Sequence, residues 1–146
     1  MKKIFYDSFV ARMLLKFSSC HTIMLFGLVF SKQKSGEMTQ ATRNHECVHA
    51  RQWVEVTLVS GFILLALTLI FGLNPWWLLS ACAVYYLWYV IEWIIKGINY
   101  TIMYDEWECK METPYRSISF EREARLSERD PNYLENSRYF AWIEEL

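Results

Sequence analysis

The sequence predicts a mainly α-helical membrane protein, in which a two-helix transmembrane hairpin joins a small α+β part outside the membrane. A run of 36 residues, from Val56 to Ile91, contains no Asp, Glu, Lys or Arg. Gly72-Leu73-Asn74-Pro75 interrupts this run near its middle, and proline and the residue before it disfavour helix continuation. A helix needs about 20 residues to cross a bilayer core. The run therefore predicts two transmembrane helices, over 54–73 and 76–97, joined by a tight turn.

The alternative is a buried helical hairpin of a soluble protein. It is disfavoured because the remainder of the chain, roughly 100 residues, is too small to bury so much aromatic surface.

The distribution of positive charge predicts the orientation of the hairpin. All fifteen Lys and Arg residues lie outside the uncharged run, eight before it and seven after it. Cytoplasmic loops carry the excess of positive charge, so both termini are expected in the cytoplasm, and the compact format suggests a bacterial inner membrane. The chain is expected to be one domain, with 1–53 and 98–146 forming its cytoplasmic part. Membrane lipid is an expected partner, and the net charge of −1 argues against nucleic acid.

The segment before the hairpin predicts three elements. Residues 4–19 have apolar positions at helical spacing and predict an amphipathic helix, lying either on the membrane surface or against the protein. Residues 21–30 are too few to span a membrane as a helix, and their Ile, Phe, Thr and Val predict a strand, with a buried helical turn as the alternative. A polar turn follows. A long helix is then expected to begin near Met38 or Thr39 and to continue into the first transmembrane helix.

The segment after the hairpin predicts two helices. Residues 117–128 predict a helix that ends at Asp130-Pro131, and 133–145 predict a short terminal helix rich in aromatic residues. Within the hairpin, Glu92 is an ionisable group near the end of the second transmembrane helix. A functional role is one interpretation, and an i,i+4 ion pair with Lys96 is the preferred one.

Two of the three histidines belong to an H-E-x-x-H motif, His45-Glu46-Cys47-Val48-His49. On a helix, residues four apart lie on one face, so both imidazoles are directed at one point, as a zinc ion requires. Glu46 is displaced by about 100° around the helix axis and reaches a water at the ion without binding the ion itself. Polar neighbours on both sides of the motif place it on a soluble turn of the helix rather than within the membrane.

A catalytic zinc needs a third protein ligand. His21 is the one histidine left and lies far upstream. On the helix over 117–128, Glu121, Ala124 and Glu128 share a face, and Glu121 is the preferred ligand, with Glu123 as the second choice. A solvated face of Glu–Arg pairs is the alternative interpretation. Arg138 is a candidate for stabilising an oxyanion, although simple packing of the aromatic terminal helix is an alternative.

Together, H-E-x-x-H, a two-helix hairpin and a glutamate in an E-x-x-A helix resemble the integral-membrane gluzincin metallopeptidases, the CAAX prenyl protease and membrane heat-shock protease type. This resemblance implies His45, His49 and Glu121 as ligands of one Zn²⁺ and Glu46 as the base. It also implies a metalloprotease-like cytoplasmic part, in which the strand over 21–30 is a sheet edge that pairs with an extended substrate. The chain departs from the family at Arg125, where the family has an aspartate, and Asp130 or Glu128 is expected to replace it.

The expected function is therefore a zinc-dependent endopeptidase that cleaves membrane-associated proteins or peptides at the cytoplasmic membrane surface. A non-enzymatic membrane adaptor or sensor with a structural or vestigial zinc site is the alternative, favoured by Arg125. An intramembrane site-two-type protease is disfavoured, because the motif is flanked by charges and no Asp follows Asn74-Pro75.

Overall fold

The computed structural model describes residues 4–104 and 112–146, which form two compact units. The first unit contains residues 4–54 and 124–139, and the second contains 55–104, 112–123 and 140–146. Two helices, α2 (Gln40–Phe71) and α5 (Ser119–Ser127), each have residues in both units.

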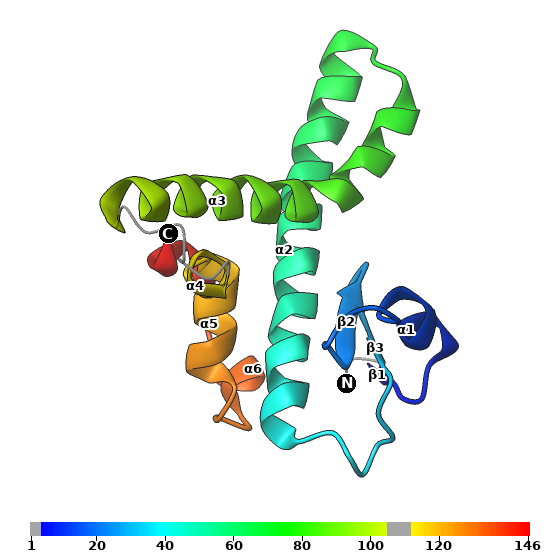
Figure 1. The fold of residues 1–146 in the computed structure, drawn as a ribbon. Helices are drawn as coiled ribbons and strands as arrows, with labels where there is room; N and C mark the ends of the chain where they lie inside the picture. The colour runs from blue at the N-terminus through cyan, green and yellow to red at the C-terminus, as the bar shows by residue number, and fades with distance from the viewer. Residues whose placement is uncertain (1–3, 105–111) are drawn as a thin grey trace. The chain divides into compact units, whose positions relative to one another are not determined.

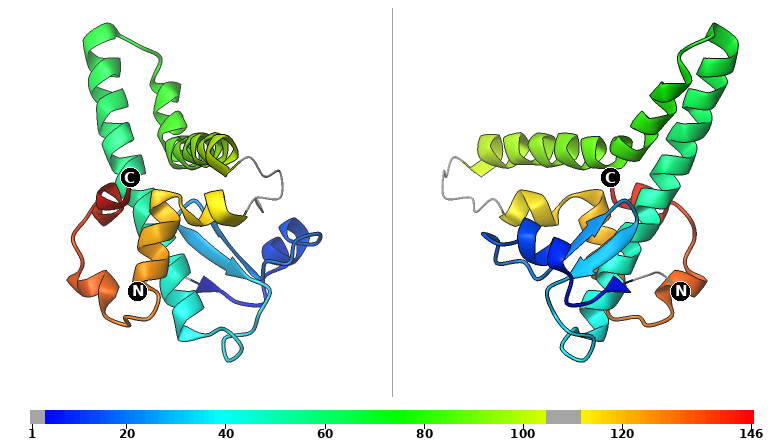
Figure 2. Two further views of the ribbon diagram at one scale, coloured as in Figure 1. Left: turned by 60° about the vertical axis from the view of Figure 1, so that its left-hand side comes forward. Right: turned by 90° about the vertical axis from the view of Figure 1, so that its right-hand side faces the viewer.

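The first unit contains a small three-stranded sheet that lies beside the N-terminal part of α2 (Figures 1 and 2). Its strands are β1 (Ile4–Phe5), β2 (Thr22–Leu25) and β3 (Leu28–Ser31), in the order β1-β3-β2. β1 is parallel to β3, and β2 is antiparallel to β3 with Ile23 opposite Phe30. β2 is therefore an edge strand among the described strands. A short helix, α1 (Phe9–Leu14), connects β1 to the hairpin.

Helix α2 contains the H-E-x-x-H motif and most of the first half of the uncharged run in one uninterrupted element of 32 residues. Thr39 caps its first turn, because the Thr39 hydroxyl accepts the N–H of Thr42 at 3.1 Å. The predicted start near Met38 or Thr39 and the continuation into the first candidate membrane helix are both confirmed.

Two helical segments are long and apolar enough to cross a membrane: Gln40–Phe71 and Pro75–Ile102. The second of these consists of a 3-10 segment, η1 (Pro75–Ser80), and most of α3 (Ala81–Tyr104). The break predicted at Asn74-Pro75 is present, and the Asn74 side chain accepts the N–H of Trp76 at 3.0 Å. The hydroxyl of Ser60 on α2 lies 3.4 Å from the carbonyl oxygen of Ala81 at the start of α3.

The C-terminal third of the chain forms short elements: α4 (Glu112–Arg116), α5, α6 (Tyr133–Asn136) and the 3-10 segment η2 (Ala141–Glu145). In the second unit, Phe120 of α5 lies at the centre of an aromatic cluster. Its ring centroid is 4.7 Å from that of Tyr85 on α3 and 4.6 Å from that of Trp142 on η2. This buried cluster packs α5 and η2 against α3.

Three predicted elements differ from the structure. Instead of one helix over 4–19, Ile4 and Phe5 pair with β3, Asp7 has a positive φ of 51°, and the helix is confined to α1. Instead of one strand over 21–30, the chain reverses at Phe26-Gly27 and forms a hairpin. Both turn residues have positive φ, 51° and 74°, as a two-residue hairpin turn requires. At the C-terminus, α6 and η2 replace the single helix predicted over 133–145.

Candidate metal centre

The two motif histidines are brought together by the helical spacing of α2. The Nε2 atoms of His45 and His49 lie 3.1 Å apart, and the ring planes are inclined at 84°. Two nitrogen ligands of a tetrahedral zinc ion, each about 2.0–2.1 Å from the metal, are themselves separated by roughly 3.3 Å. The separation in this chain is close to that value, so the pair needs little rearrangement to bind one ion.

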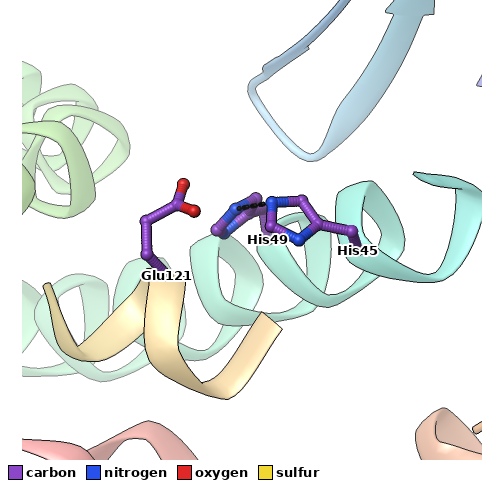
Figure 3. A group of neighbouring side chains, drawn as sticks. All are labelled: His45, His49 and Glu121. Carbon is purple, nitrogen blue, oxygen red and sulfur yellow. Dashed lines mark hydrogen bonds between the residues drawn. The ribbon is translucent and has the colours of Figure 1, made fainter. Parts of the chain in front are cut away.

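Glu121 of α5 completes a group of three possible ligands with His45 and His49 (Figure 3). One ligand atom from each of the three residues lies within 4.8 Å of the others. Glu121 is 1% exposed and His49 is 7% exposed. Two imidazoles and one carboxylate are a donor set that catalytic zinc uses in proteins, and this His-His-Glu group could hold a metal ion.

The outer nitrogens of both imidazoles face polar side chains. Nδ1 of His49 lies 2.8 Å from Oε1 of Gln52, which is completely buried. With Nδ1 as the donor, Nε2 of His49 keeps its lone pair for a metal. Nδ1 of His45 lies 3.6 Å from a carboxylate oxygen of Glu128, an ion-pair contact that is too long for a hydrogen bond. Outer partners of this kind fix the tautomer and the orientation of metal-binding histidines.

Glu128, one of the two residues expected to replace the aspartate, thus lies beside a candidate ligand, and the replacement itself stays a prediction. Asp130 contributes differently. Its backbone carbonyl oxygen accepts a hydrogen bond at 3.2 Å from the side-chain amide of Asn44, which also donates to the carbonyl oxygen of Glu128 at 3.0 Å. These bonds hold the chain that follows α5 against the first turns of α2.

Two tyrosines that the sequence analysis did not identify hold the carboxylate of Glu121. The hydroxyls of Tyr89 on α3 and Tyr115 on α4 both donate to its Oε1 atom, at 2.7 and 2.5 Å. Two donors on one oxygen restrict the rotation of the carboxylate. Tyr89 lies inside a predicted transmembrane helix and Tyr115 in a region without a clear pattern, so the sequence contains no local signal for either contact.

Glu46 is adjacent to His45 on α2 but belongs to a different set of contacts. Its carboxylate accepts a hydrogen bond from the hydroxyl of Thr22, the first residue of β2. The bond ties Glu46 to the edge strand, and its role as the base stays a prediction.

The edge strand β2 runs alongside α2, from Glu46 to Trp53. At the other end of β2, the ring of Phe26 meets that of Trp53 edge to face, with centroids 6.2 Å apart. Within the hairpin, Lys32 donates its N–H to the carbonyl oxygen of His21 at 2.8 Å. Because hydrogen-bonded pairs alternate along an antiparallel ladder, Thr22 and Met24 direct their backbone N–H and C=O groups to the open edge.

The other candidates occupy separate positions. Glu123 is buried, at 3% exposure, but among the described residues the ligand group contains Glu121 and not Glu123. His21 is exposed and lies outside the group. Arg138 is exposed, between α6 and η2, and its role as an oxyanion stabiliser stays a prediction.

Comparison of the chain with models of protein families, with curated proteins and with solved structures finds no match.

Proposed function

We propose that the protein is a zinc-dependent endopeptidase that cleaves membrane-associated proteins or peptides at the cytoplasmic membrane surface. The observation that carries the proposal is the group formed by His45, His49 and Glu121, with a further carboxylate, Glu46, next to the first histidine. This is the arrangement expected from the resemblance to integral-membrane gluzincin metallopeptidases.

In the proposed hydrolysis, the metal and the side chains have different roles. When bound, zinc lowers the pKa of a water molecule and polarises the peptide carbonyl. His45, His49 and Glu121 would hold the ion, and Glu46 would take the proton from the attacking water. The water oxygen adds to the carbonyl carbon, and Glu46 then delivers the proton to the departing amine nitrogen as the C–N bond breaks. The Thr22 hydroxyl, a donor to Glu46, keeps this carboxylate in place between the two steps.

The open edge of β2 supports an extended peptide as the substrate. Outward N–H and C=O groups at Thr22 and Met24 offer main-chain hydrogen bonds to an added strand. Because β2 runs alongside α2 from Glu46 to Trp53, a peptide paired with β2 passes the turns of α2 that carry the histidines. Main-chain pairing of this kind selects for an unfolded segment more than for a particular sequence.

The membrane part of the proposal rests on the two long apolar helices. His49 precedes the uncharged run by seven residues, or about 10 Å of helix. The two helices are proposed to cross a bacterial inner membrane as a hairpin with both termini in the cytoplasm. Substrates are then membrane proteins with cytoplasmic segments, or chains associated with lipid.

The decisive experiment separates metal binding from cleavage. Full-length protein in detergent is expected to contain about one zinc per chain and to cleave a quenched fluorescent peptide until a chelator is added. Glu46→Gln keeps the zinc and abolishes cleavage, while His45→Ala and His49→Ala lose both. Glu37→Gln, an exposed glutamate just upstream, serves as the control. Wild-type protein without stoichiometric metal contradicts the proposal.

The second candidate is a membrane adaptor or sensor in which the zinc is structural. Arg125 in place of the family aspartate favours it. In that case the metal is present and the histidine variants unfold or lose a partner, but no peptide is cleaved. Cleavage that disappears with both the chelator and Glu46→Gln excludes this candidate.

A further inference from the structure

We infer that Tyr89 and Glu92, one turn apart on α3, are positioning residues for Glu121, so that the second apolar helix supports the metal site as well as the membrane anchorage. The inference rests on the proposed zinc site. It concerns only contacts inside the second unit, where α3 meets the start of α5.

Glu92 caps α5 from a different helix. Its two carboxylate oxygens accept the backbone N–H of Ser119 at 2.8 Å and the Ser119 hydroxyl at 2.7 Å. Ser119 is the first residue of α5, and the first N–H groups of a helix have no partner within it. A carboxylate at this end also interacts favourably with the helix dipole. The bond therefore fixes where α5 begins.

Tyr89 makes the second attachment. Its hydroxyl donates to Oε1 of Glu121 at 2.7 Å, and its ring is stacked on that of Phe120 at 6.1 Å with planes inclined by 17°. The stacking fixes the rotation of α5 about its own axis, and the hydroxyl fixes the carboxylate. Tyr89 and Glu92, three residues apart on α3, thus hold Glu121 and Ser119, two residues apart on α5.

Glu92 lies where an ionised carboxylate needs polar partners, and its bonds to Ser119 supply them. It is 7% exposed at the border of the uncharged run, where an ionised carboxylate requires compensation. Lys96 lies 3.8 Å away, as predicted, but an ion pair between neighbouring turns of α3 involves no other helix. The bonds to Ser119 connect this carboxylate to the helix of the third ligand.

Glu55 supplies a matched control. It borders the same uncharged run at the other end, is 3% exposed, and also accepts two hydrogen bonds. Its donors are the N–H of Phe140 at 3.1 Å and the indole N–H of Trp142 at 3.2 Å, both in the C-terminal segment. Glu55 and Glu92 are thus alike in burial and bonding but hold different parts of the chain.

The experiment measures zinc affinity by competition with a fluorescent chelator, and amide hydrogen exchange in the metal-free, full-length protein. Glu92→Ala is expected to weaken zinc binding about tenfold or more and to accelerate exchange in residues 119–123. Glu92→Gln restores much of both, because an amide can accept the Ser119 N–H and donate to its hydroxyl. Glu55→Ala accelerates exchange in residues 140–146 and weakens zinc binding much less than Glu92→Ala, because Glu55 reaches α5 only through the contact of Trp142 with Phe120.

Tyr89→Phe separates positioning of the ligand from support of the helix. It removes one hydroxyl and keeps the stacked ring, so zinc binding is expected to weaken while exchange of α5 stays as in the wild type. The inference is overturned if Glu92→Ala and Glu55→Ala reduce zinc affinity equally, or if neither exchange pattern changes. Wild-type protein that holds no zinc defeats the proposed function instead, and the exchange experiment still tests the contact between α3 and α5.

Discussion

Nδ1 of His49 lies 2.8 Å from the side-chain oxygen of Gln52, and this contact orients the imidazole so that Nε2 faces His45. We expect Gln52→Leu, which keeps the volume and removes the acceptor, to weaken zinc binding by about 10–100-fold. Chelator competition measures the change. Gln33→Leu makes the same chemical change in the turn between β3 and α2 and should bind zinc like the wild type. Equal affinities for both variants would show that Gln52 has no part in the site.

The two neighbouring carboxylates of α5 make a test of the third ligand possible. Glu121 and Glu123 are both buried, at 1% and 3% exposure, but only Glu121 is grouped with the histidines among the described residues. Glu121→Gln is expected to reduce the zinc content of the purified protein to well below one per chain. Glu123→Gln should retain it, because the pair of histidines keeps its third donor. Elemental analysis measures both, and the reverse result would move the site to Glu123.

The open edge of β2 predicts a specific effect of proline at Met24. Proline removes an N–H that no described strand accepts, and edge strands tolerate it. Met24→Ala loses the same buried side chain but keeps the N–H. We expect Met24→Pro to raise the KM for an extended peptide well above that of Met24→Ala, with zinc content unchanged in both. Similar KM values in the two variants argue against strand pairing.

The turn of the hairpin depends on Gly27. It has a φ of 74°, and a Cβ atom there would lie 2.8 Å from Cε3 of Trp53. Gly27→Ala is expected to cost about 1–3 kcal/mol of local stability and to accelerate amide exchange in β2 and β3. Gly36→Ala is the control, because a Cβ atom at Gly36 has no neighbour within 4 Å. A Gly27→Ala variant with the exchange pattern of Gly36→Ala would contradict the packing of the turn on α2.

The proposed orientation predicts which cysteines react from which side of the membrane. Leu73 is exposed in the connection between α2 and η1, and Cys20 is exposed in the first unit. With the remaining cysteines replaced by serine, Leu73→Cys should react with an impermeant maleimide in intact cells, whereas Cys20 should react only after lysis. The opposite pattern would invert the orientation expected from the positive charges.

The features predicted from sequence are those set by local spacing. The start of α2 follows from the capping residue Thr39, and the convergence of His45 and His49 follows from the helical period. The structure groups Glu121 with these histidines, and its role as a zinc ligand stays a prediction. The shared face of the predicted helix and the resemblance favour Glu121, but no pattern in the sequence reveals its contact with the histidines.

The features that were missed depend on contacts between distant segments. No polar residue interrupts the run over 23–30, and a positive φ such as that of Phe26 is rare for a bulky residue. The sequence at the turn is therefore typical of the interior of a strand. Ile4 and Phe5 leave the predicted helix because β3 offers them a partner about 25 residues later. The sequence predicts the ion pair of Glu92 with Lys96, four residues away. It does not predict the bonds of Glu92 to Ser119, which only the tertiary structure brings close.

The uninterrupted course of α2 has a geometric consequence. Because the histidine pair and the uncharged segment share one helix, the seven-residue step from His49 to Val56 sets a fixed distance of about 10 Å between them. Each residue inserted into that interval would raise the histidines by about 1.5 Å and swing them about 100° around the helix axis. The site of cleavage in a substrate would then be set by its distance along the substrate chain from the point where that chain leaves the lipid.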